Sequence, residues 1–312
     1  MRIGRLSMAL VALVGGMAIV SLVSVSVEAQ GAAPPGPPWT ARTAWGDPDF
    51  QGLWTNWDFT PFEASDGPVE EVDPKTGSPG GLGGGMSSIY FGPVSPRRHA
   101  VVVDPPGGKV PHRDLPKPTR AQAMRLLGDH WKYHSLWHRC ITMGALNHAL
   151  LDGGISGYGK AYRLMQSPGY VVIFAEMIHE ARFIPVGGRP HVGQNVRLRT
   201  GDSRGRWEGR TLVVETTNFR NEGQLGGGQQ TDNLRLLERF ERLDEKTMKY
   251  EVTVHDPTVF TQPWVGRQFH NLDPNYVMHE YACHEGNGRF MEGALDMGRL
   301  RDAEEAAKKT TK

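Results

Sequence analysis

Apolar and polar residues alternate with a period of two along much of the second half of the chain, a pattern typical of half-buried β-strands. In the run over residues 247–255, Met248, Tyr250, Val252 and Val254 fall on one face. Other β-rich runs cover residues 49–54, 99–103, 170–175, 181–186, 206–208, 212–217, 234–243, 264–270 and 276–283. The pattern predicts a mainly β protein.

Short polar segments separate successive runs. Gly209-Arg210, Asp244-Glu-Lys246 and Asn271-Leu-Asp-Pro274 each stand where a hairpin turn is needed. Successive hairpins favour an antiparallel meander, and about eight strands are enough to close a barrel around a small-molecule cavity. We therefore expect a lipocalin-like barrel, with a β-sandwich as the alternative.

The remaining segments set the expected domain limits. Thr119 can cap a helix over residues 120–131, within a helical segment at 119–138. We expect one β-rich domain over residues 45–295. The other expected parts are a mobile Gly-rich loop at 66–88, a flexible leader at 30–44 and a charged tail at 296–312.

Residues 1–29 have the features of a secretory signal peptide. Arg2 and Arg5 precede an apolar run, and the small residues Val27 and Ala29 stand at the −3 and −1 positions of a cleavage site. The sequence thus predicts a periplasmic or secreted protein with no stable membrane association after cleavage. The alternative is an uncleaved membrane anchor, since the apolar run is about long enough to span a bilayer.

Charge narrows the range of partners. The chain has 35 Lys and Arg against 34 Asp and Glu. Because Arg2, Arg5 and Glu28 lie in the expected signal peptide, a chain starting at Gln30 carries 33 of each. Nucleic-acid binding needs a basic excess, so we expect a small-molecule ligand and no nucleic acid. The sequence predicts no oligomeric state.

Two cysteines, Cys140 and Cys283, are the only ones in the chain. In an oxidising compartment such a pair is expected to form a disulfide. The alternative is two buried free thiols. A CxxC motif does not occur, which argues against a redox-active dithiol.

An ordered set of motifs is similar to a known group of proteins. The motifs are Trp45-Gly-Asp-Pro-Asp-Phe-Gln-Gly-Leu-Trp54, Arg139-Cys-Ile-Thr142, Gln166-Ser-Pro-Gly-Tyr-Val-Val-Ile173, His179-Glu-Ala-Arg182, Gly188-Arg-Pro-His191, Gly201-Asp-Ser-Arg-Gly-Arg-Trp-Glu-Gly209, Val213-Val-Glu-Thr-Thr-Asn-Phe219, Glu238-Arg-Phe240 and Tyr281-Ala-Cys-His-Glu-Gly-Asn287.

Over residues 40–295 the chain resembles a family of secreted proteins abundant in acidobacteria and other environmental Gram-negative bacteria. The resemblance implies secretion and implies no particular activity. It also supports a bridge, because the family's equivalents of Cys140 and Cys283 occur together. His130, His134 and His138 depart from the family, which argues against a role shared with its members.

The first candidate catalytic cluster surrounds residue 180. Arg182 would hold Glu180 ionised or bind an anionic substrate group, and His179 or His191 would act as a base near neutral pH. In a strand, Glu180 and Arg182 share one face while His179 points away, so we expect the first two to line the barrel. The alternative is an ion pair on the outside of the sheet.

A second cluster follows the second cysteine. His284 and Glu285 are expected at a turn, and together with His191 they would offer imidazole and carboxylate ligands to Zn²⁺ or Fe²⁺. Neither His284-Glu285 nor His179-Glu180 has the second His of an HExxH motif. No cofactor is predicted. If the protein has one, these residues would allow a divalent metal ion.

Two further patterns have simpler interpretations. His130, His134 and His138 recur every four residues and would align on one helical face for Zn²⁺ or Cu²⁺, or simply form a solvated face. Asp202 and Arg204 are interpreted as a polar β-turn.

Two functions fit these residues. The first is an enzyme doing His and Glu acid–base chemistry, of lyase, isomerase or hydrolase type, on a small apolar or aromatic compound. The second is a non-catalytic, lipocalin-like periplasmic carrier of a hydrophobic ligand. Titratable groups converging on a cavity would favour the enzyme, and an apolar cavity would favour the carrier.

Overall fold

A computed structural model describes residues 37–65, 92–93, 95–115, 122, 126–127, 129–147, 149–151, 159–225 and 228–310. The predicted signal peptide at 1–29 and the predicted Gly-rich loop at 66–88 lie outside these residues. Half of the predicted helix at 120–131 also lies outside them.

Strands dominate the described chain. They are β1 (Gly52–Thr55), β2 (Val102–Asp104), β3 (Ala161–Ser167), β4 (Tyr170–Ala175), β5 (Ala181–Pro185), β6 (Asp202–Glu208), β7 (Thr211–Thr217), β8 (Gln224–Leu225), β9 (Gly228–Gln229), β10 (Arg235–Arg242), β11 (Thr247–His255) and β12 (Trp264–Leu272). Two short 3₁₀ turns, η1 (Trp131–Tyr133) and η2 (Met177–His179), and a long helix α2 (Cys283–Thr310) complete the elements.

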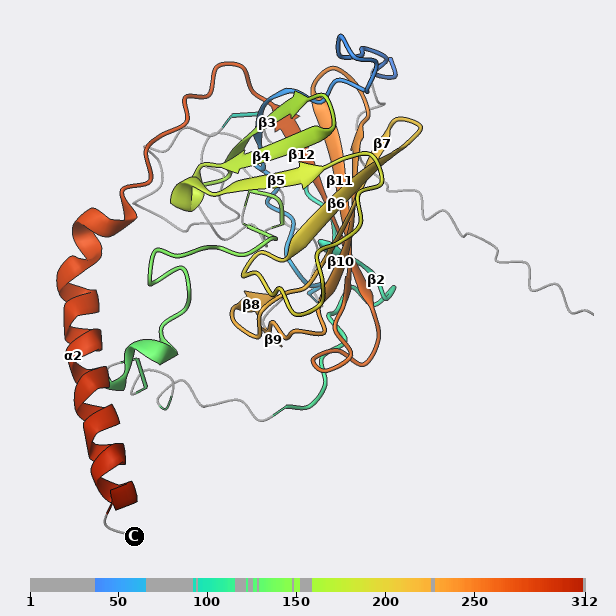
Figure 1. Ribbon diagram of the computed structural model, residues 1–312. Helices are drawn as coiled ribbons and strands as arrows, with labels where there is room; N and C mark the ends of the chain where they lie inside the picture. Colours follow the sequence, from blue (N-terminus) through green and yellow to red (C-terminus); the bar gives the residue numbers. More distant parts are fainter. Residues whose placement is uncertain are drawn as a thin grey trace, which may run out of the picture. The chain divides into compact units, whose positions relative to one another are not determined.

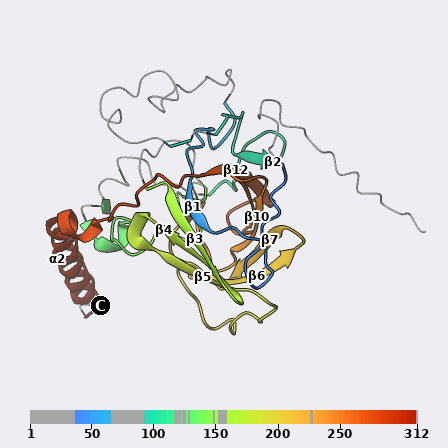
Figure 2. The same cartoon turned by 90° about the horizontal axis from the view of Figure 1, so that it is seen from above.

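Nine of the strands form an antiparallel sheet that nearly closes into a barrel, in the order β5-β4-β3-β1-β12-β11-β10-β7-β6 (Figures 1 and 2). β2 pairs with β12 beside this path, and β8 pairs with β9 separately. The two edges meet where Val186 bridges Gly205. A Cβ at Gly205 would lie 3.0 Å from side-chain methyls of Ile184 and Val186, so the glycine allows this close approach. The predicted antiparallel barrel is confirmed.

The barrel interior is occupied by side chains from alternate strand positions. Strand β11 buries every second residue from Met248 to Val254, as the alternation predicts. The segment at 145–151 contributes further apolar side chains to this core, including Ala149 and Leu150. The interior is therefore packed by the chain's own residues, including a segment that belongs to no strand.

The observed elements differ from the expected ones in three places. The predicted strand at 276–283 is wrong, because residues 274–282 are irregular and Cys283 begins α2. The helix continues through the expected charged tail to Thr310. Strand β3 was not predicted from the sequence.

The helical register expected for the three histidines is broken. His130 has an extended backbone (φ −160°, ψ 139°) and caps η1, and His134 is extended on its other side. The three side chains therefore do not share one continuous helical face.

The disulfide between Cys140 and Cys283 is present, as predicted. It joins the segment between η1 and β3 to the first residue of α2. Helix α2 also packs its Gly298 against Trp131 of η1. Among the described residues, no helix has the length and apolar character needed to cross a membrane.

Candidate functional site

Four of the six predicted site residues come together around the disulfide. We call this region the disulfide cluster: residues 137–143, 176–180 and 280–287. The ring Nε2 of His179 accepts a hydrogen bond from the Tyr281 backbone N–H at 2.8 Å. Glu180 accepts from Thr142, which follows Cys140 by two residues. His284 and Glu285 lie in the first turn of α2, directly after Cys283.

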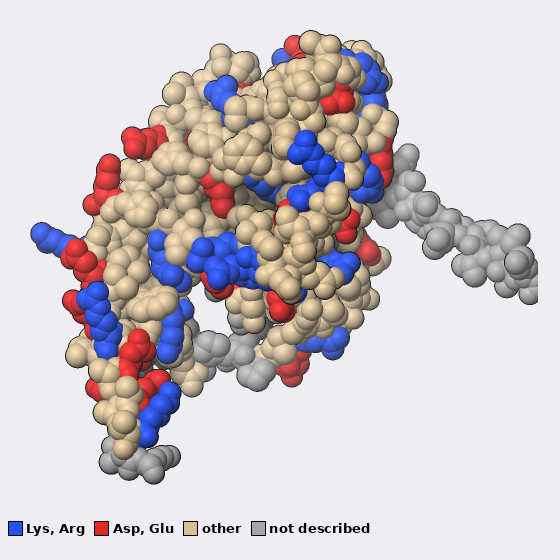
Figure 3. Space-filling view, in the orientation of Figure 1, with Lys and Arg blue, Asp and Glu red and all other residues tan. Residues whose placement is uncertain are grey.

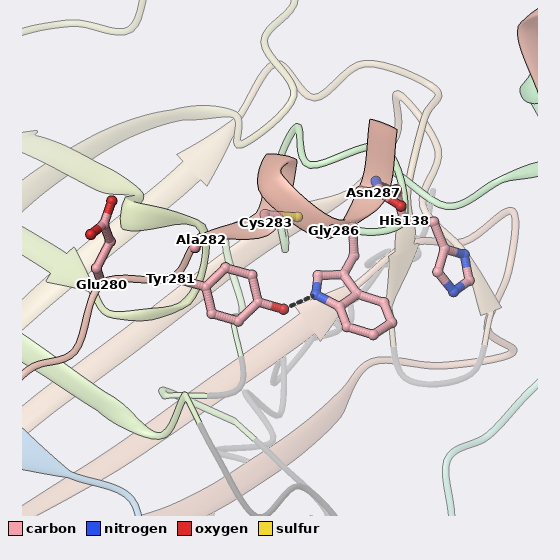
Figure 4. Close-up of a pocket in the computed structure, with 8 residues that line it drawn as sticks. His138, Glu280, Tyr281, Ala282, Cys283, Gly286 and Asn287 are labelled. Carbon is pink, nitrogen blue, oxygen red and sulfur yellow. Dashed lines mark hydrogen bonds between the residues drawn. The ribbon is translucent and has the colours of Figure 1, made fainter. Parts of the chain in front are cut away.

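A pocket of about 390 Å³ lies at this cluster, shown in Figure 4. Its lining residues are Trp137, His138, Glu280, Tyr281, Ala282, Cys283, Gly286 and Asn287. The indole N–H of Trp137 donates to the Tyr281 hydroxyl at 2.9 Å, which holds the two aromatic side chains together. In the view of Figure 4, His138 and Glu280 stand on opposite sides of Tyr281. The pocket is therefore lined by two aromatic side chains together with the imidazole of His138 and the carboxylate of Glu280.

The floor of the cluster is fixed by hydrogen bonds and by the disulfide. The side-chain amide of Asn287 donates to the His138 carbonyl at 2.6 Å, so the first turn of α2 is tied to the segment that precedes Cys140. Tyr276 donates its hydroxyl to Glu176 at 3.1 Å, and the backbone N–H of His279 donates to the same carboxylate. These contacts hold the irregular residues 274–282 against the end of β4.

Glu180 is a half-buried carboxylate of the disulfide cluster that lies outside the lining of the pocket. Its carboxylate accepts from the Thr142 hydroxyl at 2.5 Å and from the Met143 backbone N–H at 3.3 Å. Burial raises the pKa of Glu180, while these hydrogen bonds and the charge of Arg182 oppose the rise. A carboxyl that keeps its proton to higher pH than usual is suited to general acid–base work.

His138 adds a neutral imidazole to the pocket. Burial lowers its pKa, and the neighbouring His134 lowers it further. The residue is therefore uncharged at neutral pH, in the form that accepts a proton or binds a metal ion. A pocket at His138 was not predicted from the sequence, because only the fold brings α2 beside this residue.

Arg182 lies inside the barrel, and its partner is a residue the sequence did not single out as a site residue. Its guanidinium pairs in a bidentate manner with Glu238 and also donates to Ser203 and Thr216. Burial lowers the pKa of Arg182, but the charge and hydrogen bonds of Glu238 outweigh this and raise it. The predicted sharing of a barrel face by Glu180 and Arg182 is corrected: strand β5 begins at Ala181, and Glu180 instead binds the turn after Cys140.

The interior holds a second polar pair beside this ion pair. The Tyr250 hydroxyl donates to Glu238 at 2.9 Å, and the Tyr162 hydroxyl lies 2.8 Å from Nδ1 of His270. Tyr162, Tyr250, His270 and Glu238 are all completely buried. Burial raises the pKa values of both tyrosines well above 10 and lowers the pKa of His270 to about 4. The hydrogen-bonding partners of these four side chains therefore also lie inside the packed core.

His191 lies apart from both regions. Its Nδ1 is 2.9 Å from Oδ2 of Asp202, and Arg204 binds the other oxygen of that carboxylate at 2.5 Å. Asp202 and Arg204 belong to strand β6 and not to the polar turn that the sequence predicts. The expected metal site of His191, His284 and Glu285 is therefore not assembled, because His191 lies between β5 and β6 against Asp202, whereas His284 and Glu285 lie in α2. Across the described ranges, no three His, Cys, Asp or Glu side chains form a group that could hold a metal ion.

Charges of both signs are interspersed over the molecular face shown in Figure 3. This agrees with the near-equal numbers of basic and acidic residues in the chain. Comparisons of the chain with protein-family models, curated proteins and solved structures gave no match.

Proposed function

We propose that this protein is a secreted enzyme that binds a small aromatic or apolar molecule in the disulfide cluster and acts on it by acid–base chemistry. The observation that carries the proposal is the pocket itself, in which Trp137 and Tyr281 offer aromatic surface beside His138 and Glu280. Small-molecule sites are concave, with volumes of roughly 300–1,000 Å³, and combine apolar walls with a few polar groups. The pocket at α2 has this composition.

The reaction proposed is proton transfer of lyase, isomerase or hydrolase type. Glu180, with its raised pKa, is the proposed general acid or base. Its hydrogen bonds to Thr142 and Met143 fix the carboxylate within the disulfide cluster. Tyr281 is the proposed binding surface, because it lines the pocket and contacts His179 through its backbone.

The carrier function is less well supported by the geometry. A lipocalin-like carrier holds its ligand inside the barrel, where Leu150, Tyr162 and Tyr250 already pack together in the core. The interior also contains the charged pair of Arg182 and Glu238. A hydrophobic ligand would have to displace these residues, whereas the pocket at α2 is open to a small molecule.

Ligand-observed NMR tests binding. The intact protein is mixed with a panel of phenols, aromatic acids and apolar alcohols, and saturation transfer to each compound is measured. We expect bound compounds to lose at least about three quarters of their signal with Tyr281→Ala. Phe183→Ala, which removes an exposed aromatic side chain on β5, is the matched control and should retain it. A panel with no compound dependent on Tyr281 would contradict the proposal.

Mass spectrometry tests catalysis on the compounds that bind. Conversion is followed with the native chain and with Glu180→Gln, which keeps the shape of the side chain and removes its ionisation. We expect the variant to bind as before and to lose conversion by about 10²–10⁴-fold. Equal conversion by both proteins would exclude Glu180 from the chemistry.

A further inference from the structure

His134, which precedes the disulfide cluster, and His138, which belongs to it, each have a buried ring nitrogen with no hydrogen-bond partner in the described chain. In both residues this nitrogen is Nδ1. The His134 residue is only 4 % exposed. Buried polar atoms in folded proteins nearly always have a partner, so two such nitrogens on neighbouring rings require a physical explanation.

The two rings are close enough to share one ion. Their centroids are 6.0 Å apart and their planes are nearly perpendicular, at 86°. A transition-metal ion lies about 2.0–2.1 Å from each imidazole nitrogen that binds it. An ion placed between two nitrogens therefore holds the rings at a spacing of this order.

The hydrogen bond made by Nε2 of His134 leaves Nδ1 of the neutral ring unprotonated, which is the form that binds a metal ion. Nε2 of His134 lies 2.7 Å from the carbonyl oxygen of Leu127. A carbonyl oxygen only accepts, so Nε2 carries a proton, and in the neutral ring Nδ1 then holds a lone pair. Metal-binding histidines commonly donate their second ring nitrogen to a backbone carbonyl in this way, which fixes both the tautomer and the ring orientation.

His138 provides access from solvent. This residue lines the pocket together with Asn287, so one ring of the pair borders a space that is open to solvent. His130 is not available in the same way, because its Nδ1 accepts from the Lys132 N–H and its Nε2 faces Asp302. The pair of free nitrogens is thus limited to His134 and His138 within the described 129–147 segment.

We propose that His134 and His138 together bind one imidazole-preferring transition-metal ion, Zn²⁺ or Cu²⁺, through their Nδ1 atoms, with water completing the coordination. The proposal concerns binding at the wall of the pocket and does not rest on the proposed activity. It also differs from the helical alignment expected from the sequence, since an extended residue and a 3₁₀ turn bring the rings together here.

Zinc titration of the intact protein is the test, with no small molecule present. We expect one Zn²⁺ per chain by calorimetry, and at least about tenfold weaker binding in His134→Gln and in His138→Gln. His255→Gln is the matched control, because His255 is an exposed histidine on β11 that lies outside the disulfide cluster. Each variant is first checked for its folded circular-dichroism spectrum.

A second measurement uses only the native chain, so it does not depend on the variants folding. In ¹⁵N spectra of the histidine side chains, we expect one equivalent of Zn²⁺ to shift Nδ1 of His134 and His138 and to leave the His255 nitrogens unchanged. Binding that is equal in both variants and the control would overturn the proposal, as would shifts confined to other histidines. The absence of stoichiometric binding at 100-fold excess over a roughly micromolar protein concentration would also overturn it.

Discussion

His270 shows how a single buried residue links the core to pH. Nε2 of His270 lies 3.1 Å from the Leu150 carbonyl and therefore donates to it, which leaves Nδ1 to accept from the Tyr162 hydroxyl. The imidazole is thus neutral in the folded protein. Burial is the largest cause of its lowered pKa of about 4, against an ordinary value of 6.5.

We expect this residue to make the fold acid-sensitive. Between pH 6.5 and about 4, His270 is protonated in the unfolded chain but stays neutral in the folded protein. The stability that the neutral residue provides is therefore present above this pH window and is lost as the pH falls through it. The loss is on the order of 3 kcal/mol. Urea unfolding at pH 7 and at pH 4 measures it.

His270→Gln is the control for that loss, because glutamine keeps hydrogen-bonding atoms and cannot titrate.

Glu180 changes the pH dependence of stability in the opposite direction. Its raised pKa favours folding at low pH, and that contribution is lost as pH rises through the folded pKa. We therefore compare the variant with the native chain at each pH. An identical decrease in both would show that other groups cause the acid sensitivity.

The ion pair of Arg182 and Glu238 makes a second prediction at this scale. Glu238→Leu would leave the guanidinium buried among Ser203, Thr216 and Tyr250 without its counter-charge. Breaking a buried pair in this way costs about 3–5 kcal/mol of unfolding free energy. The double variant with Arg182→Met should recover most of that loss, since no buried charge remains. Chemical denaturation of the two variants tests this; equal stability would contradict it.

At the scale of elements, the features that could be predicted from the sequence are those determined by residues close together in the chain, such as hairpins. The hairpin of β10 and β11 follows from its alternation and from the Asp244-Glu-Lys246 turn, and both strands are present. The partner of Arg182 lies 56 residues away, and no local pattern encodes such a pairing. The pocket was likewise not predictable, because it needs α2, the disulfide and residues 137–138 in one place.

Helix α2 was missed for a specific reason. Glycines at 286, 288, 293 and 298 lower its helix propensity by up to about 1 kcal/mol each. The preceding alternation of His279, Tyr281 and Cys283 is strand-like. The helix forms in spite of this because the disulfide, Asn287 and Gly298 attach it to residues 130–140.

Gly298 and Gly293 allow a matched test of this attachment. A Cβ at Gly298 would lie 2.6 Å from Cδ1 of Trp131, whereas a Cβ at Gly293 meets nothing within 4 Å. We expect Gly293→Ala to stabilise α2 by up to about 1 kcal/mol. Gly298→Ala should gain the same propensity but loosen the packing on η1. Hydrogen exchange of the α2 amides measures both, and faster exchange in Gly293→Ala than in Gly298→Ala would contradict the packing argument.

At the scale of the whole molecule, the Cys140–Cys283 bond encloses strands β3 to β12 in one covalent loop. The two cysteines are separated by 143 residues, and in the chain-entropy model closing such a loop stabilises the folded state by about 5 kcal/mol. We expect the Cys140→Ser, Cys283→Ser double variant to unfold at a correspondingly lower urea concentration. Cys283 also lines the pocket, so compounds that bind there should bind more weakly after reduction even under conditions where the barrel remains folded. Intrinsic fluorescence during urea titration gives the first result, and saturation transfer before and after reduction gives the second. A midpoint unchanged by the double substitution would show that the barrel gains no stability from the bond, and unchanged ligand binding would place the binding surface away from the disulfide cluster.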